Sequence, residues 1–386
     1  MARRRLRILH ALGTLNPGGV ETWLLNILKC MDRDRLQFDF CTFGPQPGLF
    51  DTQVERLGAR ILRFQKSRNP WSFASGFRRL LREGNYNVVH SHVYLFSGAL
   101  LRWAQAEGIP IRIAHSHRSR DDRPGTPARR CYRRVMKSWI RRHATHGLAA
   151  SRPAAALFGE DWEADSRFRV LYYGIDASSF HVPIDRDQLR IELGVPVDAP
   201  VVGHVGRFVP PKNHRIVLEI AGEILKRRPE VHFLLVGDGP LRPEIEAKAR
   251  AMGLSANIHF AGTRIDVPRL LCGGMDAFVF PSLQEGFGLS VLEAQAVGLS
   301  CVVSDAVPQD VVLSRESVKF LQLSAPVSDW AAEVIRGLDA PRPQLAFALD
   351  NVAQSRFSIQ QSVRELTSIY AMVPRSTAPI TGKRYE

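Results

Sequence analysis

The sequence predicts an α/β protein built from two domains of similar design. The chain has 386 residues, of which 45% are hydrophobic, so it is long enough for two cored domains and too apolar to be disordered. Short apolar runs alternate with stretches of helical periodicity, and this alternation stops near residue 183 and starts again at Val201. Such a repeated order of strand and helix is typical of parallel sheets covered by helices.

The first half begins with an apolar strand at residues 7–12. A glycine-rich loop at residues 15–21 leads from this strand into an amphipathic helix at residues 22–30. The loop matches neither the Gly-x-Gly-x-x-Gly dinucleotide fingerprint nor a Walker loop, so it fits a simple helix start as well as a functional site. The further strands and helices expected in this half lie at residues 38–43, 50–57, 59–64, 71–81, 87–92, 111–117, 147–150 and 169–172.

Two of these strands, residues 87–92 and 111–117, end in the same tripeptide, His-Ser-His. Parallel α/β sheets bind ligands at the carboxyl ends of their strands, so these four histidines lie where chemistry is expected. A single histidine in such a place is more often a packing or capping residue. Four histidines at two strand ends favour a role in a cleft.

Residues 118–142 are strongly basic, with ten Arg or Lys and two Asp. The loop at residues 118–127 is therefore a candidate contact for an acceptor or for a membrane surface. In the helix that follows, we expect the basic face to be solvated and the apolar face to pack on the domain core. The residues of this apolar face are Tyr132, Val135, Met136, Trp139 and Ile140.

The composition restricts the partners and the compartment. Lys and Arg total 52 against 38 Asp and Glu, and the formal charge of +14 favours a phosphorylated ligand, nucleic acid or an acidic membrane face. The five cysteines are scattered without a Cys-x-x-Cys pair, which argues against a disulfide framework or zinc site and fits a reducing cytoplasm. No apolar run approaches the ~18–20 residues of a spanning helix, so we expect neither an anchor nor a signal peptide.

The second half repeats the pattern and adds two anion-binding features. In residues 285–293 a glycine-rich turn opens a helix, with Glu285 before the helix and Glu293 inside its first turns. Free backbone N–H groups at a helix start attract anions, so this stretch is expected to hold a phosphate and a sugar. Upstream, Arg207 offers a planar fork and Lys212 a point charge, a pair suited to a diphosphate. The other expected strands and helices lie at residues 201–205, 215–227, 231–236, 242–252, 258–261 and 277–280.

Three motifs, taken in order, resemble those of the family-4 retaining glycosyltransferases of GT-B fold that build exopolysaccharides and lipid-linked glycans. They are Gly206-Arg207 with Lys212, Gly237-Asp238-Gly239, and two glutamates separated by seven residues. The likeness is nearly full length and implies two Rossmann-like domains that face each other across a cleft. It implies an acceptor-binding domain at residues 1–183, a donor-binding domain at residues 184–351, and a helix that crosses back to the first domain, with a tail, at residues 352–386.

The resemblance also implies how a nucleotide-sugar donor, linked to UDP or GDP, would be held. Arg207 and Lys212 would hold the diphosphate, and Glu293 would bind the ribose hydroxyls. Glu285 would hold the sugar, and His117 would face the sugar from the first domain. His117 is chosen over His115 by its position at the strand end. The complete set of implied site residues is Gly18, Gly19, His117, Arg207, Lys212, Gly237, Thr263, Arg264, Glu285, Gly286, Phe287, Gly288, Leu289 and Glu293.

The chain departs from the family pattern at two places. Family members commonly carry Asn-Gly-[Val/Ile]-Asp at the crossing between the domains, where this chain has Tyr173, so no ligand contact is expected of that residue. Residues 118–142 contain more arginine than the pattern requires. The acceptor therefore stays open among a glycan, a lipid-linked glycan and a small molecule.

The donor motifs are not accompanied by an Asp-x-Asp run, so we expect no metal and no other cofactor, with basic side chains neutralising the phosphates. We expect retention of configuration by front-face attack, without the nucleophilic carboxylate of a retaining glycosidase. One alternative is a nucleotide-sugar epimerase, since the same scaffold hosts that activity.

A second alternative is a non-catalytic basic protein that binds membrane or nucleic acid. The basic helix has no aromatic stacking motif on its polar face, so we expect no nucleic-acid partner. A lipid-linked acceptor would bring the basic first domain to an anionic surface. The expected location is therefore the cytoplasm, with the inner face of the plasma membrane as a peripheral site.

Overall fold

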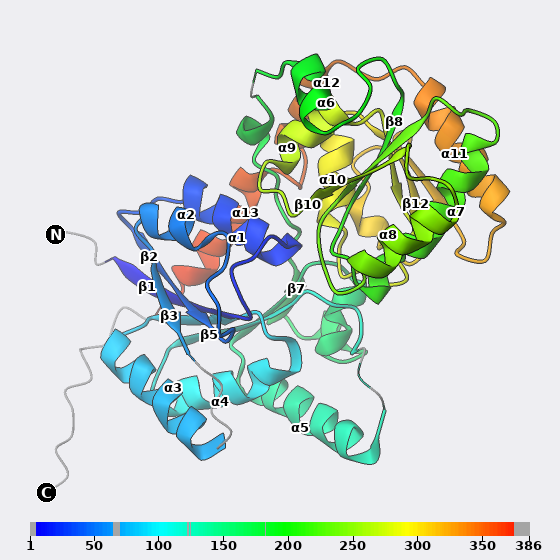
Figure 1. Ribbon diagram of the computed structural model, residues 1–386. Helices are drawn as coiled ribbons and strands as arrows, with labels where there is room; N and C mark the ends of the chain where they lie inside the picture. The colour runs from blue at the N-terminus through cyan, green and yellow to red at the C-terminus, as the bar shows by residue number, and fades with distance from the viewer. Residues whose placement is uncertain (1–4, 65–69, 122, 124, 182, 374–386) are drawn as a thin grey trace, which may run out of the picture.

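The structure is a computed structural model that describes residues 5–64, 70–121, 123, 125–181 and 183–373, and it has two α/β domains (Figure 1). The first contains a seven-stranded parallel sheet in the order β3-β2-β1-β4-β5-β6-β7, and the second a six-stranded parallel sheet in the order β10-β9-β8-β11-β12-β13. The predicted α/β architecture is confirmed. The predicted outer bounds of the first domain and of the C-terminal segment, residues 1 and 386, lie outside the described residues. Part of the loop at residues 118–127 also lies outside them.

The strands of the N-terminal domain are mostly buried, as expected for a parallel sheet covered by helices. Its strands are β1 (Leu6–Leu12), β2 (Leu36–Thr42), β3 (Arg60–Arg63), β4 (Val88–Ser91), β5 (Ile111–Ser116), β6 (His146–Ala149) and β7 (Phe168–Val170). Its α-helices are α1 (Gly19–Cys30), α2 (Asp51–Arg56), α3 (Pro70–Gly84), α4 (Ser97–Ala106) and α5 (Pro127–His143). Short 3-10 turns are η1 (Tyr94–Phe96), η2 (Pro153–Leu157), η3 (Trp162–Ala164) and η4 (Ala177–Phe180).

The C-terminal domain repeats this construction with shorter connections. Its strands are β8 (Val201–Val205), β9 (His232–Val236), β10 (Ile258–Gly262), β11 (Ala277–Phe280), β12 (Ser300–Ser304) and β13 (Val318–Leu321). Its helices are α6 (Arg186–Glu192), α7 (His214–Leu225), α8 (Arg242–Ala251), α9 (Val267–Arg269), α10 (Leu289–Ala296), α11 (Val327–Asp339) and α12 (Leu345–Gln354). The single turns are η5 (Pro210–Lys212), the π-helical η6 (Leu270–Gly274) and η7 (Gln309–Val311).

Both sheets have a point at which the strand order reverses, between β1 and β4 in the first and between β8 and β11 in the second. Helices leave these neighbouring strands toward opposite faces of the sheet, so a crevice opens beyond the carboxyl ends of the strands. The His-Ser-His ends of β4 and β5 lie beside the first reversal point. The glycine-rich stretch after β11 lies at the second.

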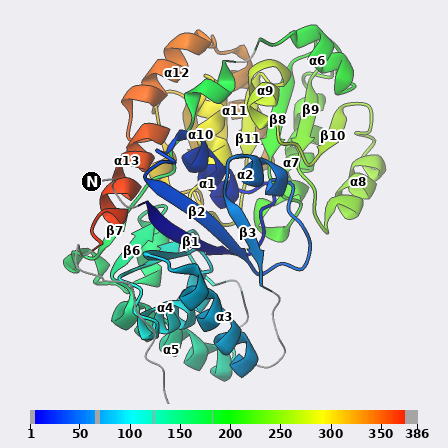
Figure 2. The ribbon, with the colours of Figure 1, turned by 90° about the vertical axis from the view of Figure 1, so that its left-hand side faces the viewer.

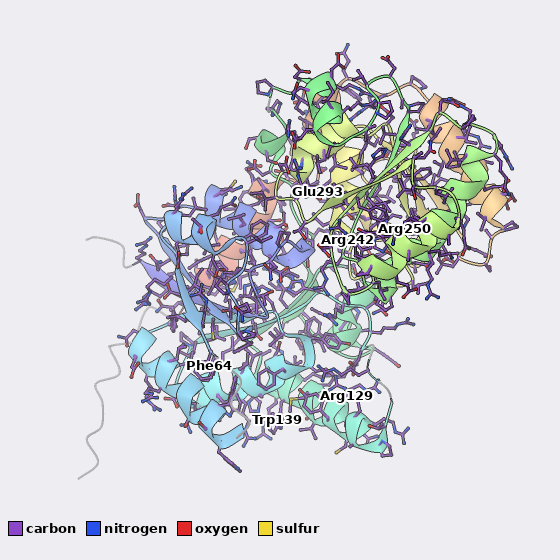
Figure 3. All side chains as sticks on the ribbon, in the orientation of Figure 1. Phe64, Arg129, Trp139, Arg242, Arg250 and Glu293 are labelled. Carbon is purple, nitrogen blue, oxygen red and sulfur yellow. The ribbon has the colours of Figure 1, made fainter. Side chains whose placement is uncertain are left out.

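The basic segment forms helix α5, on which Figure 3 labels Arg129 and Trp139. The Thr126 hydroxyl accepts a hydrogen bond of 3.2 Å from the Arg129 N–H, and Pro127 occupies the first turn, where no N–H donor is needed. The prediction for the apolar face was wrong for Val135, which is 37% exposed. The reason is that Val135 lies at the edge of the apolar stripe. The other four residues of that face, Tyr132, Met136, Trp139 and Ile140, are buried or pack against the core.

The last helix, α13 (Ile359–Tyr370), leaves the second domain and packs on α1 of the first, as predicted (Figures 1 and 2). Trp23 Nε1 donates to Ser362 Oγ at 3.3 Å, and the Tyr370 hydroxyl lies 2.8 Å from His90 Nδ1 in the core of the first domain. The predicted tail at residues 374–386 lies outside the described residues. Within the part of the chain that the structure covers, no helix is long and apolar enough to span a membrane.

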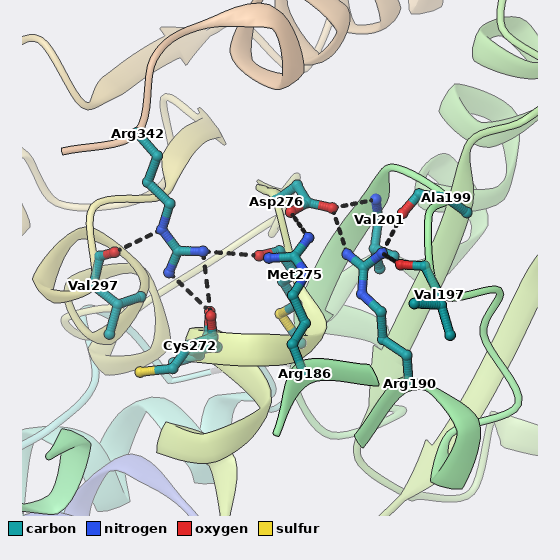
Figure 4. A network of polar contacts seen from close by, with 11 residues as sticks. Arg186, Arg190, Val197, Ala199, Val201, Cys272, Met275, Asp276, Val297 and Arg342 are labelled. Carbon is teal, nitrogen blue, oxygen red and sulfur yellow. Dashed lines mark hydrogen bonds and ion pairs between the residues drawn. The ribbon is translucent and has the colours of Figure 1, made fainter. Parts of the chain in front are cut away.

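A half-buried carboxylate, Asp276, ties α6 to the start of β8 (Figure 4). Its oxygens accept hydrogen bonds from Arg186 at 2.6 Å, Arg190 at 2.7 Å and the Val201 N–H at 2.9 Å. The Arg190 side chain is only 1% exposed. Burying a guanidinium is costly, and here Nη1 and Nη2 are paired while Nε has no hydrogen-bond partner among the described residues. The same figure shows Arg342 donating to the carbonyls of Cys272, Met275 and Val297. Arg342 also donates to the carbonyl of Leu271 at 3.2 Å.

Replacing Asp276 by Ala should strongly destabilise the C-terminal domain, because the buried Arg190 would lose its counter-charge. We expect the free energy of unfolding, measured by urea denaturation, to fall by about 3 kcal/mol. Asp161→Ala is the control, since its partner Arg141 and its own side chain are 43% and 63% exposed, and it should not move the transition. Equal losses of unfolding free energy in both variants would show that burial of the ion pair does not decide its contribution to stability.

Candidate active site

A cleft of about 1250 Å³ lies between the carboxyl ends of the two sheets. Its walls come from both domains, and the structure brings together in it every site residue implied by the sequence resemblance. These are Gly18, Gly19 and His117 from the first domain, and Arg207, Lys212, Gly237, Thr263, Arg264, Glu285, Gly286, Phe287, Gly288, Leu289 and Glu293 from the second. Their individual roles stay predictions.

The glycine-rich loop of the first domain opens directly into helix α1. This helix begins at Gly19, three residues earlier than predicted, so Gly18 is its N-cap and the free N–H groups face the cleft. A Cβ atom on Gly19 would lie 3.6 Å from the Cβ of Leu289, the first residue of α10. The N-termini of two helices from different domains therefore approach each other in the cleft, which makes the site attractive to an anion.

The loop of the second domain depends on two glycines. Gly288 is the N-cap of α10 and has a φ of 94°, a left-handed conformation that favours glycine. A Cβ atom on Gly286 would lie 1.9 Å from the carbonyl oxygen of His117. The loop can approach the first domain this closely only because Gly286 has no side chain.

Lys212 and Glu285 form an ion pair at the floor of the cleft, with 2.5 Å between Nζ and Oε1. Lys212 ends η5, and its ammonium lies 4.7 Å from the ring centre of Phe280. Arg207, two residues after β8, is exposed in the same cleft. The cations lie where a diphosphate was predicted, and in this structure one of them is neutralised by the carboxylate predicted to hold the sugar.

Glu293 and Arg264 occupy a second part of the cleft. Glu293, which is labelled in Figure 3, lies on α10 of the second domain. Burial raises its pKa to about 8. It is therefore a neutral carboxylic acid at pH 7, able to donate as well as accept a hydrogen bond. Arg264 is paired with Asp266 at 2.7 Å and with Glu192 at 2.9 Å. Its guanidinium is thus held in place beside Thr263 by carboxylates of its own domain.

At the wall of the cleft, the ends of β1, β4 and β5 bring five imidazoles together, which we call the histidine cluster. Three of the rings are buried, whereas those of His92 and His117 are half-buried and line the cleft. The rings are within 4.1–5.5 Å of one another as neighbours. Burial lowers the pKa of every ring, so the cluster is uncharged at neutral pH. Its members are His10, His90, His92, His115 and His117.

Two triplets of the cluster hold ring nitrogens within 4.8 Å of one another, a spacing that can hold a metal ion. They share His92 and contain no carboxylate. Six of the nitrogens are matched in pairs, at 3.0 Å from His10 to His92, 2.8 Å from His92 to His117, and 3.1 Å from His90 to His115. Nε2 of His10 and Nε2 of His115 are buried without a hydrogen-bond partner in the part of the chain that the structure describes. The hydrogen bonds therefore run along the cluster rather than toward one point.

His117 lines the cleft, whereas His115 is fully buried behind it. The Tyr173 hydroxyl lies 2.6 Å from His117 Nδ1, so both nitrogens of this ring have partners. Tyr173 was expected to make no ligand contact, yet it also lines the cleft.

Comparison with known proteins identifies the chain. Residues 18–174 match the profile of the glycosyl transferase 4-like domain, and residues 199–339 match that of the glycosyl transferases group 1. EpsF of Bacillus subtilis (strain 168), a protein assigned as a glycosyltransferase, is 34% identical over 370 residues, which are 94% of this chain and 96% of EpsF. The chain belongs to the family-4 glycosyltransferases.

This glycosyltransferase also resembles proteins of known structure. The crystal structure of Alr3699/HepE from Anabaena, in complex with UDP and glucose, has a TM-score of 0.78 at 21% identity, covering 95% of this chain and all of that one. That likeness confirms the GT-B fold. Among sequences, the capsular polysaccharide biosynthesis glycosyltransferase CapH of Staphylococcus aureus is 24% identical over 95% of this chain and 98% of its own.

The glycosyltransferase has cleft residues that the sequence alone did not single out. Glu21 lies in the first turn of α1, and burial raises its pKa to about 7 against the opposing effects of Arg207 and Arg118. Tyr173 and Lys29 also line the cleft. The signal for Tyr173 was present as a departure from the family pattern, whereas nothing in the sequence marked Lys29.

Replacing Gly286 by Ala should separate the two walls of the cleft, because the new methyl group would overlap the carbonyl oxygen of His117. We expect transfer activity, as kcat/KM, to fall about 100-fold, the cost of displacing reacting groups by ~1 Å. Gly222→Ala is the control, since its methyl group would meet only the Met252 side chain at 3.4 Å. Full activity of the Gly286 variant would show that the close approach is not required.

Proposed function

We propose that the protein is a retaining glycosyltransferase that moves a sugar from a UDP- or GDP-linked donor to an acceptor in cell-surface polysaccharide or glycoconjugate biosynthesis. The observation that carries this proposal is the single cleft in which all the implied donor residues meet. The solved relative with UDP and glucose supports a nucleotide-sugar donor. The capsular polysaccharide relative supports the biosynthetic setting.

The donor diphosphate would lie between Arg207, Lys212 and the N-terminus of α10. Departure of the sugar leaves negative charge on the diphosphate, so donors fixed around that position stabilise the transition state more than the ground state. The ion pair between Lys212 and Glu285 would open when donor binds. Lys212 would then bind phosphate, and Glu285 would accept hydrogen bonds from sugar hydroxyls.

Glu293 would hold the nucleoside. A neutral carboxylic acid offers one donor and one acceptor, which matches two neighbouring ribose hydroxyls. Arg264, fixed by Asp266 and Glu192, would lie with Thr263 at the base.

The transfer itself would occur on one face of the sugar. The acceptor oxygen bonds to the anomeric carbon as the bond from that carbon to the phosphate oxygen breaks, and the acceptor proton passes to the leaving phosphate. The configuration is retained without a covalent intermediate on the enzyme. Because Arg207 and Lys212 supply the positive charge, we propose that no metal or other cofactor takes part in this step.

The acceptor would bind against the first domain as a glycan, a lipid-linked glycan or a small molecule. The cleft wall there includes Lys29, Arg118, Arg123 and Arg129. With a net charge of +14, this chain would be drawn to an anionic surface, so we propose a cytoplasmic enzyme at the inner face of the plasma membrane, without a nucleic-acid partner. Absence of binding to anionic vesicles would contradict the membrane part.

The test is a panel of nucleotide sugars screened by thermal shift, followed by transfer assays. A donor at 100 times its Kd should raise stability by about 2.7 kcal/mol. The product should keep the donor's anomeric configuration by NMR, and EDTA should not reduce the rate. An inverted product would contradict retention of configuration. Loss of activity in EDTA with recovery in Mg²⁺ would contradict metal-independent transfer. Turnover of donor without acceptor would indicate an epimerase.

Separate variants of the two glutamates should divide donor binding from turnover. Glu293→Ala should mainly weaken donor binding, measured by calorimetry. Glu285→Ala should lower kcat about 10- to 100-fold, the range expected for a hydrogen bond to a charged group, and keep part of the donor affinity. Equal losses of turnover with unchanged donor affinity in both variants would contradict this division.

A further inference from the structure

One hydrogen-bonded chain of the histidine cluster ends in the active-site cleft. It runs from the Tyr173 hydroxyl through His117 and His92 to His10, with donor–acceptor distances of 2.6, 2.8 and 3.0 Å. In a hydrogen bond between two neutral imidazoles, one ring nitrogen carries the proton and the other accepts it. The protonated nitrogen of one ring therefore determines which nitrogen is protonated on the next ring. The three rings therefore share one of two possible orders of protonation, and Tyr173 stands at the end of this chain next to the donor loop.

Tyr173 is itself held firmly at the crossing between the domains. Its ring stacks on Trp23 at 5.2 Å and meets the edge of Phe287, from the donor loop, at 5.1 Å. It is 3% exposed, so its hydroxyl cannot exchange His117 for bulk water. The hydroxyl contact therefore fixes the orientation of the His117 ring as well as its proton.

Charged and titratable groups surround His117 from each neighbouring element. Arg118 follows it in the chain, and burial together with His92 and Arg118 lowers the pKa of its ring. Burial raises the pKa of Tyr173, and two carboxyl groups beyond the phenol raise it further, so the phenol stays protonated. Among the described residues, these groups include His90 and His92 at the end of β4, His115 on β5, Arg118, Tyr173 at the crossing, Glu21 on α1 and Glu285 in the donor loop.

We propose that Tyr173, His92 and His10 are positioning residues that present His117 to the transferred sugar as an uncharged imidazole with one tautomer and one ring orientation. This inference rests on the proposed function. A sugar that departs from a diphosphate gains positive charge, and a cationic imidazole beside it would oppose that charge. A neutral ring with both nitrogens held by partners can face the sugar without this penalty.

The first experiment is Tyr173→Phe, which removes only the hydroxyl. Released from that partner, His117 should adopt two tautomers and become easier to protonate. We expect kcat to fall about tenfold, donor affinity by calorimetry to stay within about twofold, and the loss of activity on acidification to begin at a higher pH than in the wild type. Nitrogen-15 spectra of labelled histidines should change from one tautomer to a mixture at His117.

Tyr172→Phe is the matched control. This neighbouring tyrosine bonds through its hydroxyl to Asp310 at 2.8 Å and is absent from the residues lining the cleft, among those that the structure describes. It should keep the wild-type pH profile. If Tyr173→Phe also keeps the wild-type kcat and pH profile, or loses donor affinity in proportion to kcat, the positioning role is wrong.

A pair of variants at His92 separates positioning from packing. His92→Asn keeps a polar atom near the position of Nδ1 and can either donate to or accept from His117, whereas His92→Leu cannot. We expect the Asn variant to recover most of the kcat lost in the Leu variant. Equal kcat in two variants of equal thermal stability would overturn the proposal.

Two further outcomes have distinct meanings. The first is that the purified protein contains stoichiometric zinc, that zinc stabilises it, and that His92→Leu abolishes this stabilisation. The cluster would then bind a metal ion, and the positioning role would be wrong. The histidine spectra do not depend on turnover. If His117 shows one tautomer in the wild type and a mixture in Tyr173→Phe, the positioning role is supported even in a protein that transfers no sugar. Absence of sugar transfer would then refute only the proposed function.

Discussion

The site depends on the contact between the backbone of Gly286 and the carbonyl group of His117. This contact presses the donor loop of one sheet against the strand end of the other. Ser151 strengthens it by donating to the Gly286 carbonyl at 2.5 Å, and Phe287 packs beside Tyr173. Because the approach involves main chain on both sides, it leaves no tolerance for a side chain at position 286. It brings the N-terminus of α10 beside His117, the member of the histidine cluster that follows β5.

Much of the fold could be predicted because the strands of parallel sheets, and the turns after them, have distinctive local sequences. Strand β11 is a continuous apolar run and β8 is apolar except for His204, and the turns after them contain the glycines that open toward the cleft. The donor residues follow strand ends at known edges of a sheet, so sequence order was enough to bring Arg207, Lys212 and Glu285 into one cleft. The elements without a distinctive local pattern, among them α4, β12, β13 and α11, were not assigned.

The pairing within the site was beyond sequence reasoning. Nothing local indicates that Lys212 binds Glu285, which is far along the chain, or that His10 joins four histidines from other strands. Burial also decides which acids stay neutral, as for Glu293, and burial is a property of the folded whole. Tyr173 shows the same limit, since its role comes from the ring and the loop it contacts.

Helix α13 gives the first domain a side chain, Tyr370, from nearly the end of the described chain. The domain whose strands leave the ribosome first is thus the domain whose core closes last. Until synthesis reaches α13, the surface of α1 around Trp23 lacks its covering helix and His90 lacks its phenol partner. The first domain, although made first, therefore receives these two contacts only after α13 has been made.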